Sequence, residues 1–545
     1  MSNLKNQTFP SLLENSVRTY GNNIALSYVN GNPLTYNDLG NEVAKIKIML
    51  VGMGISKGDK VAILSRNMPN WGISFFAITS IGAIVVPMLP DFHDDEIKNI
   101  IEHSEAKAIF VSKLMYPKIK NLPENLLDTI IYSDDFEVVK GNAVDEEIGK
   151  NTNSTVEESD LASIIYTSGT TGKSKGVMLT HKNIVFNAVQ VLTIEPVKSH
   201  HRFLSFLPLS HTYENTLGLV LPILQGASIY YLEKPPTANV LVPAMKKVQP
   251  THMLSVPMVI EKIYRNQVLP KFTNSKFLSI LYKIPTIRKI LNKLAGKKLY
   301  ETFGGKLEFF GVGGAALDPV VEKFLSEAKF PYAIGYGLTE SSPLLSGANP
   351  HVVKLKATGP ALEGIEVKIN NPDSKTGQGE VWAKGDNIMK GYYKEPDLTK
   401  EVLTSDGWLK TGDLGYFDKD NFLHLRGRIK NMIVGASGEN IYPEEIESVI
   451  NNFRYVLESV VIEKKGKLVA LVHFNYEELE KQFQDLKDEA VHFAKKKAEE
   501  LMLELQEHVN SKVNKFSRIY AVVPQLIPFE KTATQKIKRY LYVNA

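Results

Sequence analysis

The sequence contains no cysteine among its 545 residues. This absence excludes disulfides, thiolate metal sites and a cysteine nucleophile, so a thioester could form only on a thiol that a cosubstrate brings. An excess of charge of one sign is also missing, because 64 Lys and Arg against 60 Asp and Glu leave a formal net charge of +4. Such a chain has no overall field for binding nucleic acid. Met1 to Tyr20 lacks the continuous apolar core of a signal peptide, so we expect a cytoplasmic location.

Long hydrophobic runs are scarce as well. Two uncharged runs, Asn67 to Pro90 and Asn215 to Leu232, approach the length of a membrane-spanning helix. A Gly-Ala pair interrupts each run, at Gly82-Ala83 and at Gly226-Ala227, and a β-branched or aromatic stretch follows each pair. This pattern predicts a buried helix, a tight turn and a buried strand, as in a βαβ crossover, in place of a membrane span.

Strand-like and helix-like stretches alternate through the first 135 residues. They are Ile24 to Val29, Tyr36 to Val51, Lys60 to Leu64, Trp71 to Ile81, Ala83 to Pro87, Glu96 to His103 and Ala108 to Val111. Such alternation predicts an α/β fold with a mostly parallel sheet and helices on both faces. Thr35 followed by Asp38 predicts a capping box at the start of the first of these helices.

The length of the chain and a change in sequence pattern after Arg428 predict the domain organisation. A chain of 545 residues is expected to form two or more domains. After Arg428 a shorter α/β stretch leads into a charged segment, Glu477 to Lys515, that is helical by periodicity. We therefore expect a large N-terminal domain over residues 1–427 and a small C-terminal domain over residues 428–545. The polar stretch Gly141 to Asp160 is expected to be a surface loop within the larger unit.

The region Lys262 to Lys298 is strongly basic, with apolar residues such as Phe277 and Leu291 interleaved among its lysines. An ordinary pair of surface helices has this composition, and so does a basic amphipathic helix that lies on an anionic membrane surface. Both interpretations stay open.

A glycine- and hydroxyl-rich stretch, Tyr166 to Val177, follows an apolar strand and precedes a helix expected to open near Thr180. Glycines let backbone N–H groups converge, and hydroxyls and lysines add donors and charge, which is how a loop cradles phosphates. Gly172-Lys173-Ser174 imitates the end of a Walker A loop, but that motif needs a glycine where Thr167 stands. We therefore expect phosphate binding without the fold of the phosphoryl-transferring NTPases.

A second glycine motif is also misleading. Gly311 to Ala316 satisfies the dinucleotide-binding pattern G-x-G-x-x-A after a strand expected at Leu307 to Phe310. The next strand, around Tyr332 to Ile334, leads to Gly335 where that fold requires an acidic residue. Hydride chemistry is therefore disfavoured.

Six motifs follow one another along the chain. They are the phosphate loop, Leu207-Pro-Leu-Ser-His-Thr-Tyr-Glu214, Gly335-Tyr-Gly-Leu-Thr-Glu-Ser341, Thr411-Gly-Asp-Leu-Gly415, Arg426-Gly-Arg-Ile-Lys430 and Gly438-Glu-Asn-Ile-Tyr-Pro-Glu-Glu-Ile446. In this order they resemble the adenylate-forming (ANL) superfamily. Within it the chain is similar to the long-chain fatty acyl-CoA synthetases over essentially its full length.

The resemblance implies a large domain of doubly wound sheets with a β-barrel-like subdomain, and a small mobile C-terminal α/β domain. It implies an AMP-forming long-chain fatty acid–CoA ligase that uses ATP and Mg²⁺ to make acyl-AMP and pyrophosphate and then transfers the acyl group to coenzyme A. The expected partners are a fatty acid and coenzyme A, with no nucleic acid. We expect the acyl pocket near Leu207 to Leu224. A homodimer and peripheral contact with the inner membrane face stay open.

The nucleotide-binding residues are carried over at positions that match the family's motifs. The triphosphate loop would comprise Thr167, Ser168, Gly169, Thr170, Thr171, Gly172 and Lys175. The loop along the adenine would comprise Gly313, Gly314 and Ala315, and Gly335, Tyr336 and Gly337 would also bind the nucleotide. The resemblance implies that Tyr336 stacks on the base, that Asp413 accepts both ribose hydroxyls and that Arg428 makes a second ribose contact. Glu340, with Thr167, would bind Mg²⁺ through oxygen, as that ion prefers.

The residues implied for catalysis are Lys536, His211 and Thr339. Lys536 matches the lysine that bridges the attacking carboxylate and the α-phosphate, where a cation offsets repulsion between two anions. The resemblance places Thr339 at the α-phosphate and His211 beside the substrate carboxylate. Lys430 matches the hinge about which the small domain turns between half-reactions. Gln535 and Ser174 depart from the frequent Gly and Pro, and neither change removes a ligand.

Two other functions stay open. A fatty acyl-AMP ligase or a related adenylate-forming enzyme would pass the acyl group to a different acceptor, such as a carrier protein. A non-catalytic lipid-binding protein of the membrane surface would use the basic region Lys262 to Lys298, but it would leave the phosphate loop and Lys536 unexplained.

Overall fold

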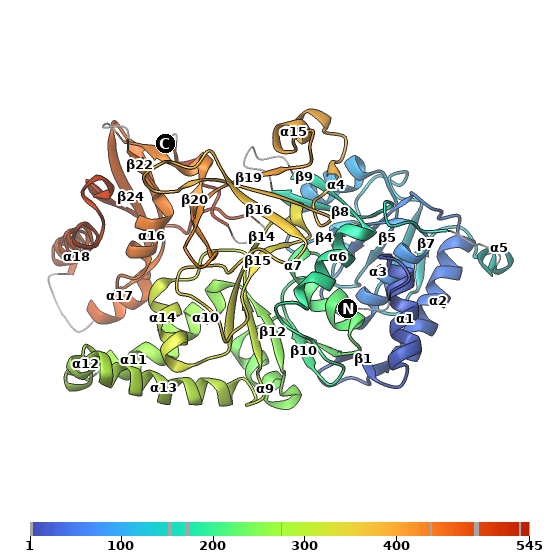
Figure 1. The fold of residues 1–545 in the computed structure, drawn as a ribbon, viewed down its shortest axis with the longest axis horizontal. Helices are drawn as coiled ribbons and strands as arrows, with labels where there is room; N and C mark the ends of the chain where they lie inside the picture. Colours follow the sequence, from blue (N-terminus) through green and yellow to red (C-terminus); the bar gives the residue numbers. More distant parts are fainter. Residues whose placement is uncertain are drawn as a thin grey trace.

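A computed structural model describes residues 4–150, 155–168, 174–273, 275–435, 439–483, 490–532 and 536–543, with backbone only at 168, 480–483 and 490–498. Two eight-stranded sheets, a four-stranded antiparallel sheet and a small C-terminal sheet form the α/β fold, which confirms the expected fold class (Figure 1). No helix in these ranges is both long and apolar enough to cross a bilayer.

The first eight-stranded sheet is parallel except at its two edges. Its order is β15 (Leu344–Gly347), β14 (Tyr332–Gly337), β13 (Phe309–Val312), β12 (His252–Ser255), β10 (Arg202–Ser205), β11 (Ser228–Tyr231), β1 (Ile24–Tyr28) and β2 (Leu34–Thr35). The edge strands β15 and β2 pair antiparallel, and the six strands between them pair parallel.

The second eight-stranded sheet has the same mixed character. Its order is β18 (Gly391–Tyr392), β9 (Ser174–Thr180), β8 (Leu161–Ser168), β4 (Ile84–Met88), β3 (Lys60–Leu64), β5 (Ala106–Val111), β6 (Thr129–Tyr132) and β7 (Val138–Lys140). The five strands from β8 to β6 are parallel, and β9, β18 and β7 run antiparallel to their neighbours.

The two uncharged runs are buried core, as predicted. Helix α3 (Pro69–Ser80) contacts β1 of the first sheet and β3 and β4 of the second, so it lies between the sheets, and ten of its twelve residues are buried. A helix that is hydrophobic all round belongs in such a position. The second run forms a helical segment, η2 (Asn215–Val220) with α8 (Leu221–Leu224), followed by strand β11.

Other helices cover the sheets and the loops that join them. In the first half of the chain these are α1 (Phe9–Tyr20), α2 (Tyr36–Gly52), α4 (Asp94–Ser104), α5 (Glu146–Lys150), α6 (His181–Val191), α7 (Thr212–Glu214), α9 (Ala238–Val248), α10 (Pro257–Ile263), η3 (Tyr264–Val268) and α11 (Leu269–Thr273). The capping box at Thr35 and Asp38 is present at the start of α2, which confirms that prediction.

One local prediction was wrong in part. Residues 141–160 were expected to be a loop, but they contain helix α5, which packs against α2. Gly149 permits this contact, because a Cβ at that position would lie only 2.5 Å from the carbonyl oxygen of Ile48. The polar composition of the segment favoured a loop, and it gave no sign of a short helix held by the close approach of its backbone at Gly149 to that of α2.

The rest of the larger unit ends in an antiparallel sheet of β16 (Ile365–Asn370), β17 (Gly379–Gly385), β19 (Leu409–Phe417) and β20 (Leu423–Arg428), which corresponds to the implied β-barrel-like subdomain. The helices that precede it are α12 (Lys276–Tyr282), α13 (Pro285–Thr302), α14 (Pro319–Ala328) and η4 (Thr339–Ser341), and α15 (Pro396–Val402) lies between β18 and β19. In Figure 1 this sheet lies between the C-terminal elements at the left and the two large sheets.

The C-terminal elements have a core of their own, around Ile446, Val461 and Leu505. They comprise η5 (Ile429–Asn431), β21 (Ile433–Val434), β22 (Asn440–Ile441), α16 (Pro443–Asn451), β23 (Val456–Lys464), β24 (Lys467–Phe474), α17 (Tyr476–Phe483), α18 (Ala490–Lys512), η6 (Lys515–Ser517), β25 (Ala521–Gln525) and α19 (Tyr540–Val543). Within the charged segment 477–515, the described residues lie mainly in the two helices α17 and α18, as predicted. We propose that residues 1–427 and 428–545 are the two domains, because a separate hydrophobic core is what defines such a unit.

Candidate active site

A single cavity of about 3180 Å³ runs between the first large sheet, the antiparallel sheet and the C-terminal elements. The ends of β13 and β14 and the loops after them form one wall, where ligands of open α/β sheets usually bind. All the predicted site residues that the structure describes line this cavity, apart from Ser168, whose side chain is not described. Gly169, Thr170, Thr171 and Gly172 lie outside the described residues.

Asp413 lies at the centre of a buried polar cluster. Its carboxylate accepts a hydrogen bond of 2.7 Å from the Tyr336 hydroxyl and lies 2.9 Å from Nε of Arg428. Burial raises the pKa of Asp413, and the Arg428 charge opposes that rise. Asp413 and Arg428 are opposite each other on β19 and β20, so the sheet register places this pair. A carboxylate held in this way can accept hydrogen bonds from two neighbouring hydroxyl groups of a ligand.

Glu340 lies in a second cluster, in the short helix η4. Its Oε1 atom accepts a hydrogen bond of 2.8 Å from the Tyr392 hydroxyl. The amine of Lys175 lies 5.1 Å from the centre of the Tyr392 ring, within the range of a cation–π contact. Thr339 is adjacent in the chain and also lines the cavity. Carboxylate, hydroxyl and amine groups from three separate segments therefore meet at one place.

The phosphate loop connects two strands of a hairpin, and this differs from the strand–loop–helix arrangement expected from the sequence. Strands β8 and β9 pair antiparallel, with Thr167 opposite Lys175. Helix α6 begins at His181, with Thr180 as its N-cap as predicted, but it follows the whole of β9. The Lys175 side chain is consequently positioned by a strand, and β9 separates the loop from the N-terminus of α6 along the chain.

The small residues form an accessible wall. Gly313 and Gly314 follow β13, and Ala315 is exposed beside them. Gly314 has φ +84°, a conformation that L side chains rarely adopt. A Cβ on Gly313 would come within 3.2 Å of the Tyr213 ring. Gly335 and Gly337 flank Tyr336 on β14. The wall therefore admits a flat group close to the backbone.

His211 is a neutral side chain at this site. Burial, together with the nearby charge of Lys536, lowers the pKa of His211 to about 4. Its Nδ1 atom accepts a hydrogen bond of 3.3 Å from the backbone N–H of Tyr213, so the proton of the neutral ring is on Nε2. This ring can therefore donate one hydrogen bond to an anion in the cavity.

Lys536 precedes Ile537, which pairs with Lys531 in an antiparallel bridge, and lies beside the cluster of Asp413. The backbone N–H of Thr532 donates to the carbonyl oxygen of Lys536 at 2.8 Å, and the backbone N–H of Lys536 donates to the hydroxyl oxygen of Thr532 at 3.2 Å. Burial lowers the pKa of Lys536, as does the charge of Arg428, whereas Asp413 and Glu340 oppose that change. The amine is thus surrounded by cavity walls while keeping contact with the solvent in the cleft.

A second arginine fixes the segment that carries Lys536. Arg539 donates to both carboxylate oxygens of Glu447 at 2.7 and 2.6 Å, and also to the carbonyl oxygen of Val461. Bidentate pairs of this kind constrain geometry as well as contributing energy. The hinge residue implied by the resemblance, Lys430, is exposed in η5 at the end of β20. Its role stays a prediction.

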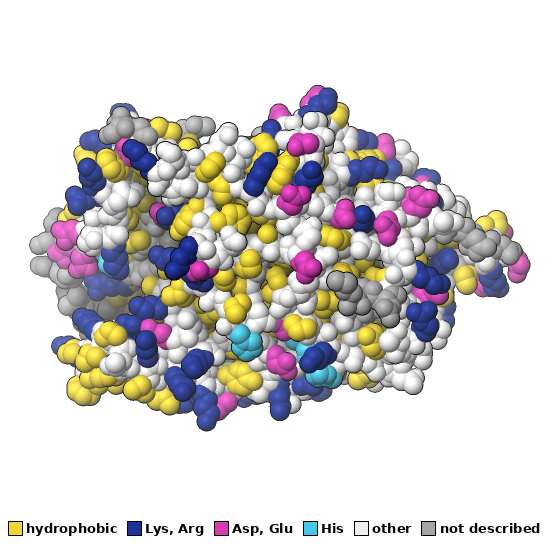
Figure 2. All heavy atoms as spheres, viewed as in Figure 1, with side chains coloured by type: hydrophobic (Ala, Val, Ile, Leu, Met, Phe, Trp, Pro, Cys, Tyr) yellow, Lys and Arg dark blue, Asp and Glu magenta, His cyan; other side chains and the backbone are white. Residues whose placement is uncertain are grey.

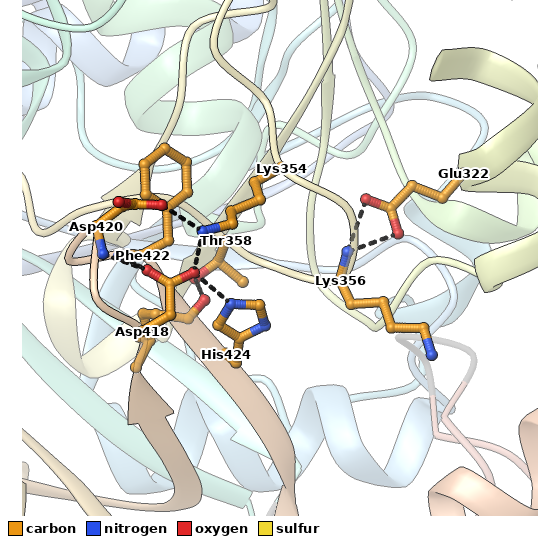
Figure 3. A network of polar contacts seen from close by, with 9 residues as sticks. Glu322, Lys354, Lys356, Thr358, Asp418, Asp420, Phe422 and His424 are labelled. Atoms are coloured by element: carbon orange, nitrogen blue, oxygen red, sulfur yellow. Dashed lines mark hydrogen bonds and ion pairs between the residues drawn. The ribbon is translucent and has the colours of Figure 1, made fainter. Parts of the chain in front are cut away.

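A strap of residues 349–358 lines the cavity at 355–358, and polar contacts shown in Figure 3 hold it in place. Lys354 lies 2.5 Å from Asp418 and 2.8 Å from Asp420, at the turn between β19 and β20. Two residues further along, the backbone N–H of Lys356 donates to both oxygens of Glu322, at 3.0 Å each. Burial raises the pKa of Glu322 to about 7. These contacts hold the end of the strap against the cleft.

Several functional neighbours have no signal in the sequence. Tyr392, which holds Glu340, and the pair of Arg539 and Glu447 lie far from one another along the chain and are brought together only by the fold. Only the first half of the stretch Leu207 to Leu224, where the acyl pocket is expected, lines the cavity, and its role in acyl binding stays a prediction. Residues 207, 208, 210, 211, 213 and 214 line the cavity, but 215–224 form η2 and α8, which pack into the core.

A family profile described as AMP-binding enzyme matches residues 13–393. The chain belongs to the AMP-binding enzyme family. It therefore belongs to the adenylate-forming superfamily, as the sequence motifs predicted, and it is an enzyme of that ligase family.

Three relatives illustrate the range of this family. A long-chain-fatty-acid–[acyl-carrier-protein] ligase, AEE15 of Arabidopsis thaliana, is 27% identical over 565 residues, covering 87% of this chain and 77% of its own. The long-chain-fatty-acid–CoA ligase heimdall of Drosophila melanogaster is 27% identical, covering 82% and 72%. Fatty acyl-CoA synthetase A of Dictyostelium discoideum is 30% identical, covering 73% and 65%.

Solved structures show the same fold. The ATP-bound RpMatB-BxBclM chimera B1 has a TM-score of 0.78 at 22% identity, covering 99% of this chain and 98% of its own. The o-succinylbenzoate coenzyme A synthetase MenE from Bacillus subtilis, in complex with ATP and a magnesium ion, has a TM-score of 0.76 at 22% identity, covering 98% and 99%. The similarity of fold thus extends over nearly the whole chain.

Glu214 provides a prediction that tests the electrostatics of the cavity floor. Its carboxyl group is fully buried, Oε2 has no hydrogen-bond partner among the described residues, and burial raises the pKa to about 8. The folded protein therefore keeps a proton that the unfolded chain releases above about pH 4.5. Since ionisation is penalised only in the folded state, the wild type should lose about 1.4 kcal/mol of stability per pH unit between these two values.

We expect the Glu214→Gln variant to escape this loss. The thermal midpoint of the variant, relative to wild type, should rise steadily between pH 5 and pH 8, and the difference in unfolding free energy should grow by about 2.5 kcal/mol between pH 5 and pH 7. Differential scanning at several pH values measures it. A difference that does not change with pH would show that Glu214 ionises equally in both states.

Proposed function

We propose that this protein is an AMP-forming long-chain fatty acid–CoA ligase. A carboxylate oxygen of the fatty acid attacks the α-phosphorus of ATP, and the bond from that phosphorus to the bridging oxygen breaks to release pyrophosphate. The sulfur of coenzyme A then attacks the acyl carbon, loses its proton and displaces AMP. The absence of cysteine agrees with a thiol that arrives with the cosubstrate.

The observation that carries the proposal is the meeting of Lys536 with Asp413, Arg428 and Glu340 in one cleft. An amine at this point can reduce the repulsion between an incoming carboxylate and an α-phosphate, and can neutralise the charge that develops as they react. Asp413 would hold the ribose through its two hydroxyls, with Arg428 beside it. Tyr336 would contact the adenine with its ring while its hydroxyl remains on Asp413.

The same cleft can hold Mg²⁺ with the nucleotide. The described residues contain no cluster of three His, Asp or Glu side chains that could hold a metal ion alone, so an ion here needs phosphate oxygens as ligands. Glu340 and the hydroxyl of Thr167 are hard oxygen donors that suit it. When bound, Mg²⁺ would neutralise charge on the phosphates. Lys175 would add a further cation, and Thr339 and His211 would donate hydrogen bonds to the reacting oxygens.

An apolar arm of the cavity supports a long hydrocarbon substrate. Beyond His211 its lining residues include Leu241, Met245, Met253, Val256, Phe303 and Phe310. These side chains come from α9, β12, β13 and the residues that follow β12 and α13, whereas the polar clusters come from β14, η4, β18, β19 and β20. Apolar walls with a few polar groups at one end are typical of sites for amphipathic ligands. The carboxylate would lie near Lys536 and the chain would follow the arm.

The test is an assay of AMP release with ATP, Mg²⁺ and coenzyme A across acids of increasing chain length. We expect the highest activity with long-chain acids. A maximum at short or aromatic acids would overturn the long-chain specificity and leave adenylate formation standing.

Carrier-protein transfer remains the second candidate, since AEE15 is named for it. A side-by-side thioester assay with coenzyme A and a carrier protein separates the two acceptors. Absence of ATP–pyrophosphate exchange with any fatty acid would instead favour the non-catalytic lipid-binding protein.

We further propose that the C-terminal domain turns about Lys430 between the two half-reactions. Lys430 is exposed and lies between β20 and the C-terminal core, where changes in a few backbone torsions could rotate everything that follows. The small domain would then present a different face to the cleft when coenzyme A binds.

A further inference from the structure

Five large apolar side chains stand exposed on α12, on α13 and at the junction between them. The exposed fractions are 70% for Phe277, 63% for Ile280, 43% for Ile284, 61% for Ile290 and 60% for Leu294. Figure 2 shows hydrophobic side chains and lysines or arginines gathered over these helices at the lower left of the molecule. We call these residues, with the lysines between them, the α12–α13 surface. Exposed apolar groups that cluster in this way mark interaction sites.

The charge of the same region has one sign. Residues 262–300 include ten lysines and arginines and no aspartate or glutamate. Lys276, Lys283, Lys289 and Lys293 are exposed, and none of them forms an ion pair with a described residue. The surface therefore presents unneutralised positive charge beside its apolar groups.

Packing against the protein does not account for these exposed groups, because the opposite face of α13 provides that contact. Asn292, Gly296 and Leu299 are buried, and Asn292 donates to Glu327 of α14 at 2.8 Å. Arg288 pairs with the same carboxylate at 2.9 Å. The helix is thus fixed from behind, while its apolar and basic face remains uncovered.

The α12–α13 surface also adjoins the apolar arm of the cavity. Leu299, Thr302 and Phe303 at the end of α13 line that arm, and so does Ile263 of α10. Met258 lines the cavity while 51% of its side chain is exposed, so the cavity reaches solvent on this side of the molecule.

We propose that the α12–α13 surface docks the protein on a bilayer of anionic phospholipid. The apolar side chains would enter the interface while the lysines contact the headgroups, as in interfacial amphipathic helices. A second copy of this chain is a poorer partner, since a symmetric contact would bring the lysines of both copies together. Docking rests on the surface alone. If the proposed function is also correct, docking would set the apolar arm beside the phase in which fatty acids accumulate.

The experiment measures cosedimentation with vesicles of neutral phosphatidylcholine, with or without anionic phosphatidylglycerol, and without ATP, fatty acid or coenzyme A. We expect wild type to bind the anionic vesicles, with an affinity that falls as salt rises. The variant Lys283→Glu, Lys289→Glu, Lys293→Glu should bind at least about a hundredfold more weakly, because each lysine near an anionic surface contributes a factor of about five and the glutamates add repulsion. The variant Phe277→Ser, Ile280→Ser, Ile290→Ser should also bind more weakly, at every salt concentration.

The matched control is Lys120→Glu, Lys375→Glu, Lys465→Glu, which changes the net charge equally at exposed sites elsewhere. This control should bind vesicles as wild type does. An equal loss of vesicle binding in the control would overturn the proposal, because binding would then depend on net charge alone. Equal binding to neutral and anionic vesicles would overturn it as well. A change of oligomeric state in the α12–α13 variants, without a change in vesicle binding, would assign the surface to a second copy instead. All these outcomes can be interpreted even if the protein shows no ligase activity, because vesicle binding is measured without the ligase substrates.

Discussion

Replacing Lys536 with alanine is expected to slow acyl-adenylate formation roughly 10²- to 10³-fold, the effect of losing one preorganised donor from a site of developing charge. Thioester formation from supplied acyl-adenylate should stay close to the wild-type rate. The reason is that the amine faces Asp413 and Glu340 in the arrangement described here, where the attacking carboxylate and the α-phosphate would meet. The second half-reaction has no two anions to bring together at that point.

The two steps are measured separately, by ATP–pyrophosphate exchange and by release of AMP from synthetic acyl-adenylate with coenzyme A. The matched control is Lys538→Ala, which removes the same charge from the same segment; that amine lies 3.8 Å from Glu530. The control should keep both rates. An equal loss in both steps for Lys536→Ala would contradict the role assigned to this residue.

The helices and strands of the fold could be predicted from the sequence where the hydrophobic periodicity agrees with the observed burial. Helix α3 shows why, since its uncharged residues could be distinguished from a membrane span only by the Gly-Ala turn and the β-branched strand that follow it. The hairpin of β8 and β9 was not accessible in the same way. A glycine-rich loop has the same sequence pattern whether a strand or a helix follows it. Only the pairing of Thr167 with Lys175 in the sheet shows that a strand follows this one.

The candidate site likewise contains residues that the sequence predicted and residues that it could not predict. Asp413, Tyr336 and Glu340 stand in compact motifs, so resemblance alone indicated them. Their supports could not be predicted, because Tyr392 is 52 residues from Glu340 and Arg539 is 92 residues from Glu447. A single sequence contains no record of such long-range pairs, and only the folded register of strands and the docking of the C-terminal tail bring them into contact.

Replacing Glu340 with glutamine is expected to reduce acyl-adenylate formation roughly 10²-fold at a fixed Mg²⁺ concentration. The amide keeps the size of the side chain and one oxygen, but it removes the negative charge that we propose holds the ion beside the phosphates. Part of the activity should return as Mg²⁺ is raised, because weaker binding can be offset by concentration. A titration of ATP–pyrophosphate exchange with Mg²⁺ measures both effects.

The companion variant, Tyr392→Phe, separates the positioning of Glu340 from the binding of Mg²⁺ by Glu340. It removes the hydroxyl that lies 2.8 Å from Oε1 of Glu340 and keeps the ring beneath the amine of Lys175. Groups that orient a metal ligand typically contribute 10- to 100-fold to affinity, so the Mg²⁺ requirement should rise by about tenfold with little change in the maximal rate. A lower maximal rate with an unchanged Mg²⁺ requirement in both variants would contradict metal binding by Glu340. The carboxylate would then act on the nucleotide only through its charge.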